Sequence, residues 1–376
     1  MNILIVESSI LPTRGGIQRV SYRLSEYFES VGIGCFFLYY LVGFDEFPES
    51  KLLKYDNKES YGTFRLKVLS FIREKGIDLV LIQGLTSNLI VNFLKENSKR
   101  NWVKTIFCLH LTPDYFIYEN KQKTLKQRLK EFILGYDSNA LNMRKIYKNV
   151  DAYVLLSNRF KSKFLELTGI KDASHLFSIS NPLSFDVFQQ DNVKNKDVLI
   201  VTRFHESQKN LSASYRIWKR VEEYAVKNGW TLKLAGYGND QDSSLGYAMS
   251  LELKNFQFLG KTENPSELFK NAAIFMMTSC YEGFPMTLLE VQQYGCVPIV
   301  FDSFASVHDI ISADNGILVQ AFNEEKYASE LIQLMMRSDL RDKLSKNGIE
   351  TCKRFSLNNI GNEWIALFKN IGIKNV

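Results

Sequence analysis

Short, continuously apolar runs alternate along the chain with longer segments whose apolar residues recur at helical spacing. Runs of this kind are typical of strands buried on both faces of a parallel sheet. Their alternation with helices predicts doubly wound α/β domains. The predicted strands are Ile3–Val6, Cys35–Leu41, Leu79–Ile82, Lys104–Leu109, Ala152–Leu156, Phe177–Ser180, Val198–Val201, Thr231–Ala235, Phe256–Leu259, Ile274–Met277, Pro298–Phe301 and Ile317–Val319.

The strand–helix series occurs twice, which predicts two domains. A polar segment at Asn181–Lys196 begins with Asn-Pro and separates the two series as a linker. The length of 376 residues suits two domains of this class. We predict a first domain over residues 1–185 and a second over 186–355. Residues 356–376 form a last amphipathic helix, which we expect to pack back on the first domain.

The composition is that of a water-soluble globular protein, with 45% apolar and 23% charged residues. No run approaches the roughly 20 apolar residues of a membrane span. The N-terminus resembles a first strand and lacks the basic start of a signal peptide. The five cysteines lie far apart without a CxxC pair, so we expect core residues and no zinc site. These features predict a cytoplasmic protein.

The net charge of +6 is concentrated in residues 121–148, where eight Lys and Arg face only Glu131 and Asp137. Such a patch predicts an anionic partner. A helical face of five apolar residues accompanies the lysines, namely Leu125, Leu129, Phe132, Ile133 and Tyr136. One interpretation is a helix docked on anionic lipid at the inner face of the cell membrane. The other is an ordinary helix with one core face and one solvated face.

Three segments carry candidate chemistry, and each directly follows a predicted strand. The first contains Gly15 and Gly16, before a helix with Ile17 and Val20 on its apolar face. Glycines let backbone amides approach a ligand, and a helix N-terminus favours an anion. The segment lacks the GxGxxG pattern of dinucleotide sites, and a tight turn is the alternative.

The second segment contains Arg203 and Lys209, after the strand Val198–Val201. Parallel sheets bind ligands at the carboxyl ends of their strands. Two cations there suit a diphosphate, because each charge-assisted hydrogen bond contributes about 1.5–3 kcal/mol. A solvated loop is the alternative.

The third segment covers residues 279–290, after the strand Ile274–Met277. Pro285 is suited to open a helix, which places Glu282 at the helix mouth and Glu290 about one and a half turns inside. The two carboxylates can accept hydrogen bonds from the hydroxyls of a sugar and a ribose. Between them, the backbone of Gly283, Phe284, Pro285 and Met286 can meet an anionic oxygen.

Glu282 and Glu290 are spaced as in the EX7E motif of retaining glycosyltransferases with the GT-B fold, and the chain resembles glycosyltransferase family 4. The resemblance covers nearly the whole chain and is sharp from about residue 180 to 320. The matching elements, in order, are Gly15-Gly16, Asn181-Pro182, Arg203 with Lys209, Gly236-Tyr237-Gly238, Phe258-Leu259-Gly260, Glu282 to Glu290, Gly295 to Val300 and Asn315-Gly316.

This resemblance implies two Rossmann-like domains facing a central cleft, with the acceptor bound by the first and the nucleotide sugar by the second. It implies transfer of a hexose, with retained configuration, from a UDP-sugar to a glycan or lipid-linked acceptor. Surface polysaccharide or glycolipid assembly is the implied setting. The donor is a substrate, so we expect no cofactor and no metal.

The resemblance also implies residue roles. Glu282 holds the donor sugar, Glu290 holds the ribose, and Arg203 and Lys209 neutralise the diphosphate, which Gly16 approaches from the first domain. Leu259 and Gly260 border the nucleobase. His110, at the end of the strand Lys104–Leu109, is a cleft histidine near the reacting sugar.

Two features depart from the motif set. Asp309 stands in a region where many family members have a glutamate, and Asp240-Gln241-Asp242 superficially resembles a DxD metal motif, which we interpret as a solvated loop. Three alternative functions remain at this point. They are a nucleotide-sugar 2-epimerase of the same fold, a basic nucleic-acid binder and a non-catalytic relative. The Gly-Phe-Pro setting of Glu282 favours a transferase, and the clustered cations argue against nucleic acid.

Overall fold

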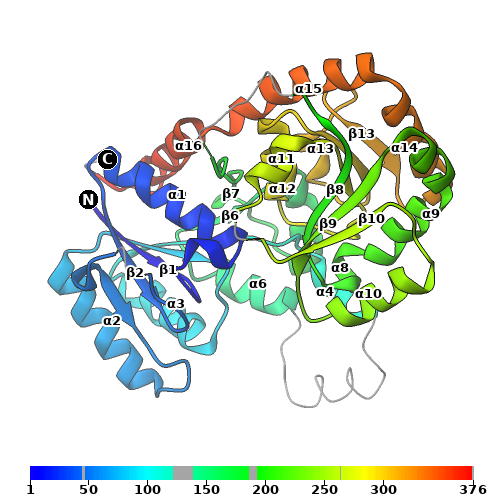
Figure 1. Cartoon of the computed structure of the whole chain (residues 1–376). Helices are drawn as coiled ribbons and strands as arrows, with labels where there is room; N and C mark the ends of the chain where they lie inside the picture. Colours follow the sequence, from blue (N-terminus) through cyan, green and yellow to red (C-terminus); the bar gives the residue numbers. More distant parts are fainter. Residues whose placement is uncertain (45–46, 122–138, 186–192, 263, 375–376) are drawn as a thin grey trace. The chain divides into compact units, whose positions relative to one another are not determined.

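The computed structural model describes residues 1–44, 47–121, 139–185, 193–262 and 264–374. The chain divides into two compact units (Figure 1). Unit 1 comprises Met1–Phe116, Thr124–Ser184 and Phe355–Val376, and unit 2 comprises Ile117–Lys123 and Phe185–Arg354.

Unit 1 is built on a seven-stranded parallel sheet with the order β3-β2-β1-β4-β5-β6-β7. All strand pairs among its described residues are parallel. The strands are β1 (Asn2–Val6), β2 (Gly34–Tyr39), β3 (Leu52–Lys54), β4 (Leu79–Gln83), β5 (Lys104–Leu109), β6 (Ala152–Leu155) and β7 (Leu176–Ser178). The helices are α1 (Gly16–Ser30), α2 (Tyr61–Lys75), α3 (Asn88–Arg100), α6 (Asn139–Tyr147), α7 (Lys161–Thr168) and α16 (Leu357–Asn370). Helix α4 (Tyr115–Lys121) begins in unit 1 and continues into the segment grouped with unit 2.

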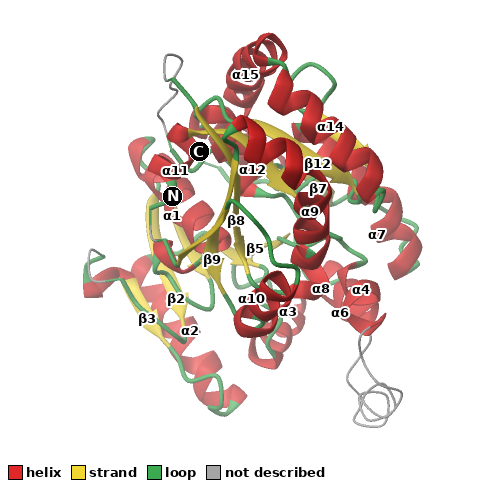
Figure 2. Cartoon of the chain, turned by 45° about the vertical axis from the view of Figure 1, so that its right-hand side comes forward, coloured by secondary structure: helices red, strands yellow, loops and turns green. Residues whose placement is uncertain are grey.

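Unit 2 repeats this plan with a six-stranded sheet in the order β10-β9-β8-β11-β12-β13. Its strands are β8 (Asn195–Arg203), β9 (Thr231–Tyr237), β10 (Phe256–Gly260), β11 (Ala272–Met277), β12 (Val297–Asp302) and β13 (Ile317–Gln320). Its helices are α8 (Glu206–Lys209), α9 (Leu211–Asn228), α10 (Gln241–Ser250), α11 (Ser266–Asn271), α12 (Met286–Gln293), α13 (Val307–Ile310), α14 (Glu324–Met336) and α15 (Ser338–Cys352). Helices flank the strands in each unit (Figure 2).

In both sheets the chain adds strands first on one side of the first strand and then on its other side. In unit 1 the chain moves outward from β1 to β3 and then returns to place β4 beside β1. In unit 2 it moves from β8 to β10 and returns to place β11 beside β8. Such reversals open a crevice at the carboxyl ends of the two central strands, where α/β proteins bind ligands. We call these two places, at the carboxyl ends of β1 and β4 and of β8 and β11, the switch points of the units. Functional residues are expected there.

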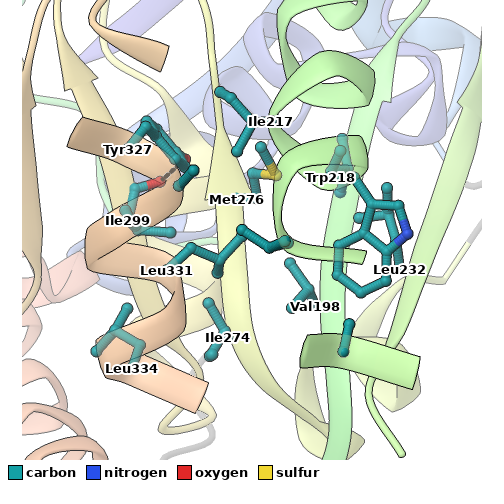
Figure 3. Close-up of a cluster of buried hydrophobic side chains, with 14 of the residues drawn as sticks. Val198, Ile217, Trp218, Leu232, Ile274, Met276, Ile299, Tyr327, Leu331 and Leu334 are labelled. Carbon is teal, nitrogen blue, oxygen red and sulfur yellow. Dashed lines mark hydrogen bonds between the residues drawn. The ribbon is translucent and has the colours of Figure 1, made fainter. Parts of the chain in front are cut away.

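The core of unit 2 forms where α9 and α14 pack against the sheet (Figure 3). Trp218 and Tyr327 are fully buried there, and each satisfies its polar atom. The indole nitrogen of Trp218 donates to the carbonyl of Lys254 at 2.9 Å. The hydroxyl of Tyr327 donates to the carbonyl of Ile299 at 2.6 Å and accepts from the amide of Met277 at 3.2 Å. These bonds fix α14 on β11 and β12, the strands that lead to the site.

The C-terminal helix α16 belongs to unit 1, where it packs on α1 (Figure 1). The hydroxyl of Tyr27 donates to the side chain of Asn362 at 2.8 Å, and the rings of Phe28 and Phe368 lie 5.4 Å apart. Gly361 lies against the Tyr27 ring, since a Cβ at this position would come within 2.3 Å of the ring. The chain thus returns to its first helix at its end.

Each strand expected from the sequence is present, and the α/β fold with two parallel sheets is confirmed. β3 is an addition, because three residues at a sheet edge are too few to show a periodic pattern. Residues 117–121 also differ from expectation, since the sequence analysis places them in the first domain and the structure groups them with unit 2. In unit 2 the ring of Tyr118 stacks on Tyr281 at 5.0 Å.

None of the five cysteines, all of which lie among the described residues, forms a disulfide, and Cys280 is half-buried while the other four are buried. The expectation of core cysteines therefore holds for four of them. Among the described residues, no helix is long and apolar enough to cross a membrane.

Candidate functional site

The switch point of unit 2 gathers the second and third candidate segments. β8 ends at Arg203 and leads into α8, whereas β11 ends at Met277 and leads through the 278–285 loop into α12. Because β8 and β11 are neighbours, both segments leave the same edge of the sheet side by side. Arg203 is exposed, and among the residues that the structure describes none pairs with its guanidinium group.

Lys209 and Glu282 form an ion pair at this switch point. The Lys209 Nζ donates to Glu282 Oε1 at 2.5 Å. The pair is shielded from water, since the side chains are 18% and 8% exposed. The structure therefore brings together two residues that the sequence places 73 positions apart. Such a pair holds one positive and one negative group at the sheet edge where parallel α/β domains bind ligands.

Two neighbours that the sequence analysis did not select also bind the Glu282 carboxylate. The Ser279 hydroxyl donates to Oε1 at 2.7 Å, and the Gln208 side-chain amide donates to Oε2 at 3.3 Å. Ser279 is itself held by Ser303, whose hydroxyl donates to the Ser279 carbonyl at 2.5 Å. Ser279 and Gln208 lie inside the segments chosen from the sequence, but only the folded contacts identify them.

The helix α8 is fixed to the loop after β11 through its backbone. The amide of Cys280 donates to the carbonyl of Gln208 at 2.7 Å. The Thr278 hydroxyl lies 3.1 Å from the carbonyl oxygen of Lys209 and 3.0 Å from that of Asn210. These bonds fix the distance between the backbone segments that carry Lys209 and Glu282.

Glu206, the first residue of α8, and Asp240 make further contacts that hold this helix. The Glu206 carboxylate accepts hydrogen bonds from the amides of Leu211 and Ser212 at 3.0 and 3.1 Å, so it caps the start of α9. The Asp240 carboxylate accepts from the amide of Glu206 at 2.7 Å.

The expectation of a solvated loop at Asp240-Gln241-Asp242 is wrong for the loop, because α10 begins at Gln241, whereas Asp242 is exposed as expected. Asp240 immediately precedes α10, Asp242 lies in its first turn, and the Asp240 carboxylate is half-buried against α8. Over the described ranges, no cluster of three His, Cys, Asp or Glu side chains could hold a metal ion.

The start of α12 carries the remaining residues of the third segment. Pro285 precedes the helix, which begins at Met286, one residue later than the sequence indicates. Gly283, Phe284 and Pro285 are buried, and Met286 is half-buried. Glu290 lies in the middle of α12 and is buried, with a 2% exposed side chain. Asp309 lies on the short α13 and is half-buried.

The carboxyl ends of β9 and β10 form an open part of this edge. Leu259 is exposed at the end of β10, and Gly260 follows at φ +75°, a left-handed conformation that favours glycine. The ring of Tyr237 is also exposed, with the Lys261 ammonium 5.2 Å from its centre. Gly236 lets β9 approach β8, since a Cβ there would lie 1.9 Å from the Thr202 carbonyl oxygen.

In unit 1, the glycine segment lies where the sequence predicts. Gly15 is fully extended, with φ and ψ of 178°, and α1 begins at Gly16. The same switch point contains Glu7, which directly follows β1 and which the sequence analysis did not select. Glu7 is 1% exposed, and the hydroxyl of Ser21 on α1 donates to its carboxyl group. Burial raises the pKa of Glu7 to about 8.

His110 directly follows β5 and is buried beside Gln83 at the end of β4. Its Nε2 lies 2.6 Å from Gln83 Oε1. An amide oxygen only accepts hydrogen bonds, so Nε2 carries the proton and Nδ1 keeps its lone pair. Burial lowers the pKa of His110 to about 4. His110 is therefore neutral at physiological pH.

The basic segment lies mostly outside the described residues. Lys123, Lys126, Arg128 and Lys130 fall in the range 122–138, as do all five apolar residues of the predicted docking face. Arg144, Lys145 and Lys148, at the end of α6 and just after it, are exposed.

Comparison with known proteins identifies the class of this site. Residues 185–351 match the family model described as "Glycosyl transferases group 1". The chain is 26% identical to the amylovoran biosynthesis glycosyltransferase AmsD of Erwinia amylovora over 286 residues, which is 76% of each protein. It is 34% identical to the lipopolysaccharide 1,6-galactosyltransferase of Escherichia coli K12 over 101 residues, 25% of this chain and 28% of that one.

Solved structures share the whole fold. Anabaena HepE in complex with UDP-glucose superposes with a TM-score of 0.77 at 15% identity, covering 98% of this chain and 100% of that one. A mutant TarM from S. aureus, solved with UDP and glycan ligands, gives a TM-score of 0.76 at 11% identity, covering 98% and 99%. At these identities the likeness shows the fold alone, which is the GT-B arrangement that the sequence predicts.

The matched range contains Arg203, Lys209 and Glu282 of the unit 2 switch point, and Glu290 of α12. Residues 185–351 thus form a glycosyl transferases group 1 domain, and the chain is a glycosyltransferase with the GT-B fold.

Proposed function

We propose that this enzyme transfers a hexose, with retained configuration, from a UDP-sugar to a hydroxyl of a growing surface glycan. The observation that carries the proposal is the charge set at the unit 2 switch point. The exposed Arg203 guanidinium and the Lys209–Glu282 pair supply cations for a diphosphate and a carboxylate for sugar hydroxyls. Buried Glu290, further along α12, is assigned to the ribose.

The solved relatives support the choice of donor. HepE has been solved with UDP-glucose, and TarM with UDP. The exposed Leu259, with Gly260 in its left-handed conformation, gives an open strand end to which we assign the nucleobase. The relatives named above are all glycosyltransferases, which favours transfer over epimerisation of the donor.

The acceptor is proposed from the named relatives. AmsD acts in the biosynthesis of amylovoran. A Campylobacter jejuni relative, 28% identical over 139 residues (37% of each chain), transfers N-acetylgalactosamine to a sugar on diphospho-undecaprenol. We assign a glycan or lipid-linked glycan acceptor to this chain, and its binding to unit 1.

The chemical task is to break the bond between the anomeric carbon and the diphosphate. Negative charge grows on the leaving phosphate while the sugar becomes oxocarbenium-like. The cations of Arg203 and Lys209 stabilise the first change, and electrostatic stabilisation of this kind is usually the largest single contribution to catalysis. Glu282 positions the sugar, and the departing phosphate oxygen helps to deprotonate the acceptor. The proposal therefore needs no covalent nucleophile and no metal ion.

A nucleotide-sugar screen tests the function. Thermal shift with UDP- and GDP-sugars identifies the donor, and mass spectrometry of reactions with glycan acceptors identifies the product. Glu282→Ala is expected to lower transfer by at least about 100-fold. Glu267→Ala, an exposed glutamate on α11, is the matched control and is expected to act like the wild type. Near-normal transfer by Glu282→Ala would remove Glu282 from the site.

Chelation tests the metal-independent mechanism. Transfer is expected to continue in EDTA at the wild-type rate, because Arg203 and Lys209 supply the positive charge. Loss of activity in EDTA that manganese or magnesium restores would contradict this mechanism.

We further propose that the basic segment 121–148 binds anionic lipid at the inner face of the cell membrane. The exposed Arg144, Lys145 and Lys148 contribute to its charge. Charges near an anionic membrane surface contribute about 1 kcal/mol each. Vesicles with phosphatidylglycerol are expected to carry the protein in flotation, and the triple Glu variant of these three residues is expected to bind less. Equal flotation with neutral and anionic vesicles would reject this location.

A further inference from the structure

The ion pair between Lys209 and Glu282 presents a conflict with the proposed roles of the two residues. The proposal gives Lys209 to the diphosphate and Glu282 to the sugar. In the structure each is bound to the other at 2.5 Å and mostly buried. A lysine whose charge is neutralised by a carboxylate attracts a phosphate weakly. A diphosphate that binds Lys209 strongly would therefore compete with Glu282 for this ammonium group.

The Glu282 carboxylate has other hydrogen-bond donors besides Lys209. Its Oε1 also accepts from the Ser279 hydroxyl at 2.7 Å, and its Oε2 accepts from the Gln208 amide at 3.3 Å. Both carboxylate oxygens keep a protein donor when the ammonium group leaves. This matters because a buried carboxylate without donors is strongly unfavourable.

Only the side chain of Lys209 needs to move. The carbonyl oxygens of Gln208, Lys209 and Asn210 are bound by the loop after β11, through the Cys280 amide and the Thr278 hydroxyl. The lysine side chain, by contrast, is a flexible four-carbon stem with a rotating ammonium group. The structure thus combines a fixed backbone with one movable charge.

We propose that Lys209 exchanges partners when the donor binds, leaving Glu282 for the diphosphate, while Ser279 and Gln208 act as positioning residues that hold the carboxylate for the sugar. This inference rests on the proposed function. The ion pair holds the two side chains in place beside each other. In the complex Lys209 contacts the diphosphate and Glu282 contacts the sugar. The exchange therefore requires no further charged side chain.

The exchange predicts opposite effects for two neighbouring variants on the binding of free UDP, measured by isothermal titration calorimetry. Glu282→Gln releases Lys209 from its carboxylate, so UDP binding is expected to tighten about tenfold while sugar transfer falls. Ser279→Ala removes a donor that Glu282 needs most after Lys209 has left, so UDP binding is expected to weaken severalfold. Ser279→Thr keeps the hydroxyl and is expected to restore the wild-type value.

The variant Lys209→Ala separates the exchange from simple charge repulsion. If the tightening requires Lys209, then Glu282→Gln has little effect on UDP binding in the Lys209→Ala background. An equal tightening in both backgrounds would mean that the glutamate only repels the phosphates, and would overturn the proposal. Weaker UDP binding in both Glu282→Gln and Ser279→Ala would also overturn it, because damaged structure lowers affinity in each case. Glu267→Gln serves as the exposed control and is expected to leave UDP binding unchanged.

The wild-type protein distinguishes failure of this inference from failure of the proposed function. If it binds neither UDP nor GDP and transfers no sugar, the proposed function is wrong. If it binds and transfers but the variants lack the opposite effects, only the exchange is wrong. Thermal unfolding of each variant shows whether it is folded. If Glu282→Gln does not fold, the weakening by Ser279→Ala and its rescue by Ser279→Thr decide the question.

Discussion

Glu7 is a carboxylic acid inside unit 1, and we predict that Glu7→Gln makes the stability of this unit less dependent on pH. The side chain is 1% exposed. The Ser21 hydroxyl binds Oε1, whereas Oε2 has no hydrogen-bond partner within the described residues. Burial raises the pKa of Glu7 from 4.5 to about 8, although the bond from Ser21 opposes this rise. The folded protein therefore holds a proton that the unfolded chain releases at neutral pH.

The sign of the effect follows from proton linkage. A carboxyl group with a raised pKa in the folded state stabilises that state fully below pH 4.5 and loses this contribution as pH rises to about 8. Each pH unit between these values changes the free energy of unfolding by about 1.4 kcal/mol. Over the whole interval, from 4.5 to about 8, the loss is about 5 kcal/mol. Between pH 5 and 7 alone, it is about 2.5 kcal/mol.

Glutamine removes the titrating proton and keeps the shape. Its amide oxygen accepts from Ser21, and its NH2 group replaces the protonated oxygen of the acid. We expect Glu7→Gln to be similar to the wild type near pH 5 and more stable by a margin that widens as pH rises. Urea unfolding at pH 5, 6, 7 and 8 gives the free energies. Hydrogen exchange of peptides from β1 and β4 measures the stability of unit 1 separately from that of unit 2.

The control for this experiment is Glu74→Gln on α2, whose carboxylate is 64% exposed and which is expected to leave the pH dependence unchanged. Parallel stability curves for the wild type and Glu7→Gln would refute the reasoning. They would mean that Glu7 is ionised in the folded protein, so that burial is compensated by hydrogen bonds or by water.

Three further predictions concern packing and ionisation. Gly236→Ala is expected to destabilise unit 2 by about 3 kcal/mol in urea unfolding, because its Cβ would lie 1.9 Å from the Thr202 carbonyl oxygen. Gly246→Ala, with open space on α10, is expected to be neutral or stabilising. Tyr327→Phe is expected to cost about 1–3 kcal/mol in the same assay, because it leaves a buried amide of β11 unbonded. His110 is expected to titrate near pH 4 by NMR, and a midpoint above pH 6 would contradict its burial.

The sequence predicts the sheets well because their strands are continuous apolar runs. The strand Lys104–Leu109 is predicted without error, and the others differ by a few residues at their ends. β3 is the exception. Leu52, Leu53 and Lys54 form a strand because β2 offers them a free edge, and this pairing is a tertiary effect that a three-residue pattern does not contain.

The sequence also places the charged residues of unit 2 at strand ends, but it does not show how they pair. Lys209 and Glu282 meet because β8 and β11 are neighbours, which depends on the strand order. The contact of Asp240 is likewise not predicted by the local sequence. Its polar surroundings indicate a solvated loop, whereas the end of β9 brings its carboxylate to the amide of Glu206. Pair contacts of this kind follow from topology rather than from local composition.

The two switch points carry different kinds of polar group, and this difference agrees with the proposed division of labour. In unit 1, Glu7 has a pKa of about 8 and His110 one of about 4, so both side chains are mainly uncharged at pH 7. Their neighbour Gln83 is uncharged as well. In unit 2, the corresponding edge carries Arg203 and the Lys209–Glu282 pair. Diphosphates require fixed charge, whereas sugar hydroxyls are bound by neutral donors and acceptors at a smaller desolvation cost. The same α/β plan thus provides one edge suited to a charged donor and another suited to an uncharged sugar.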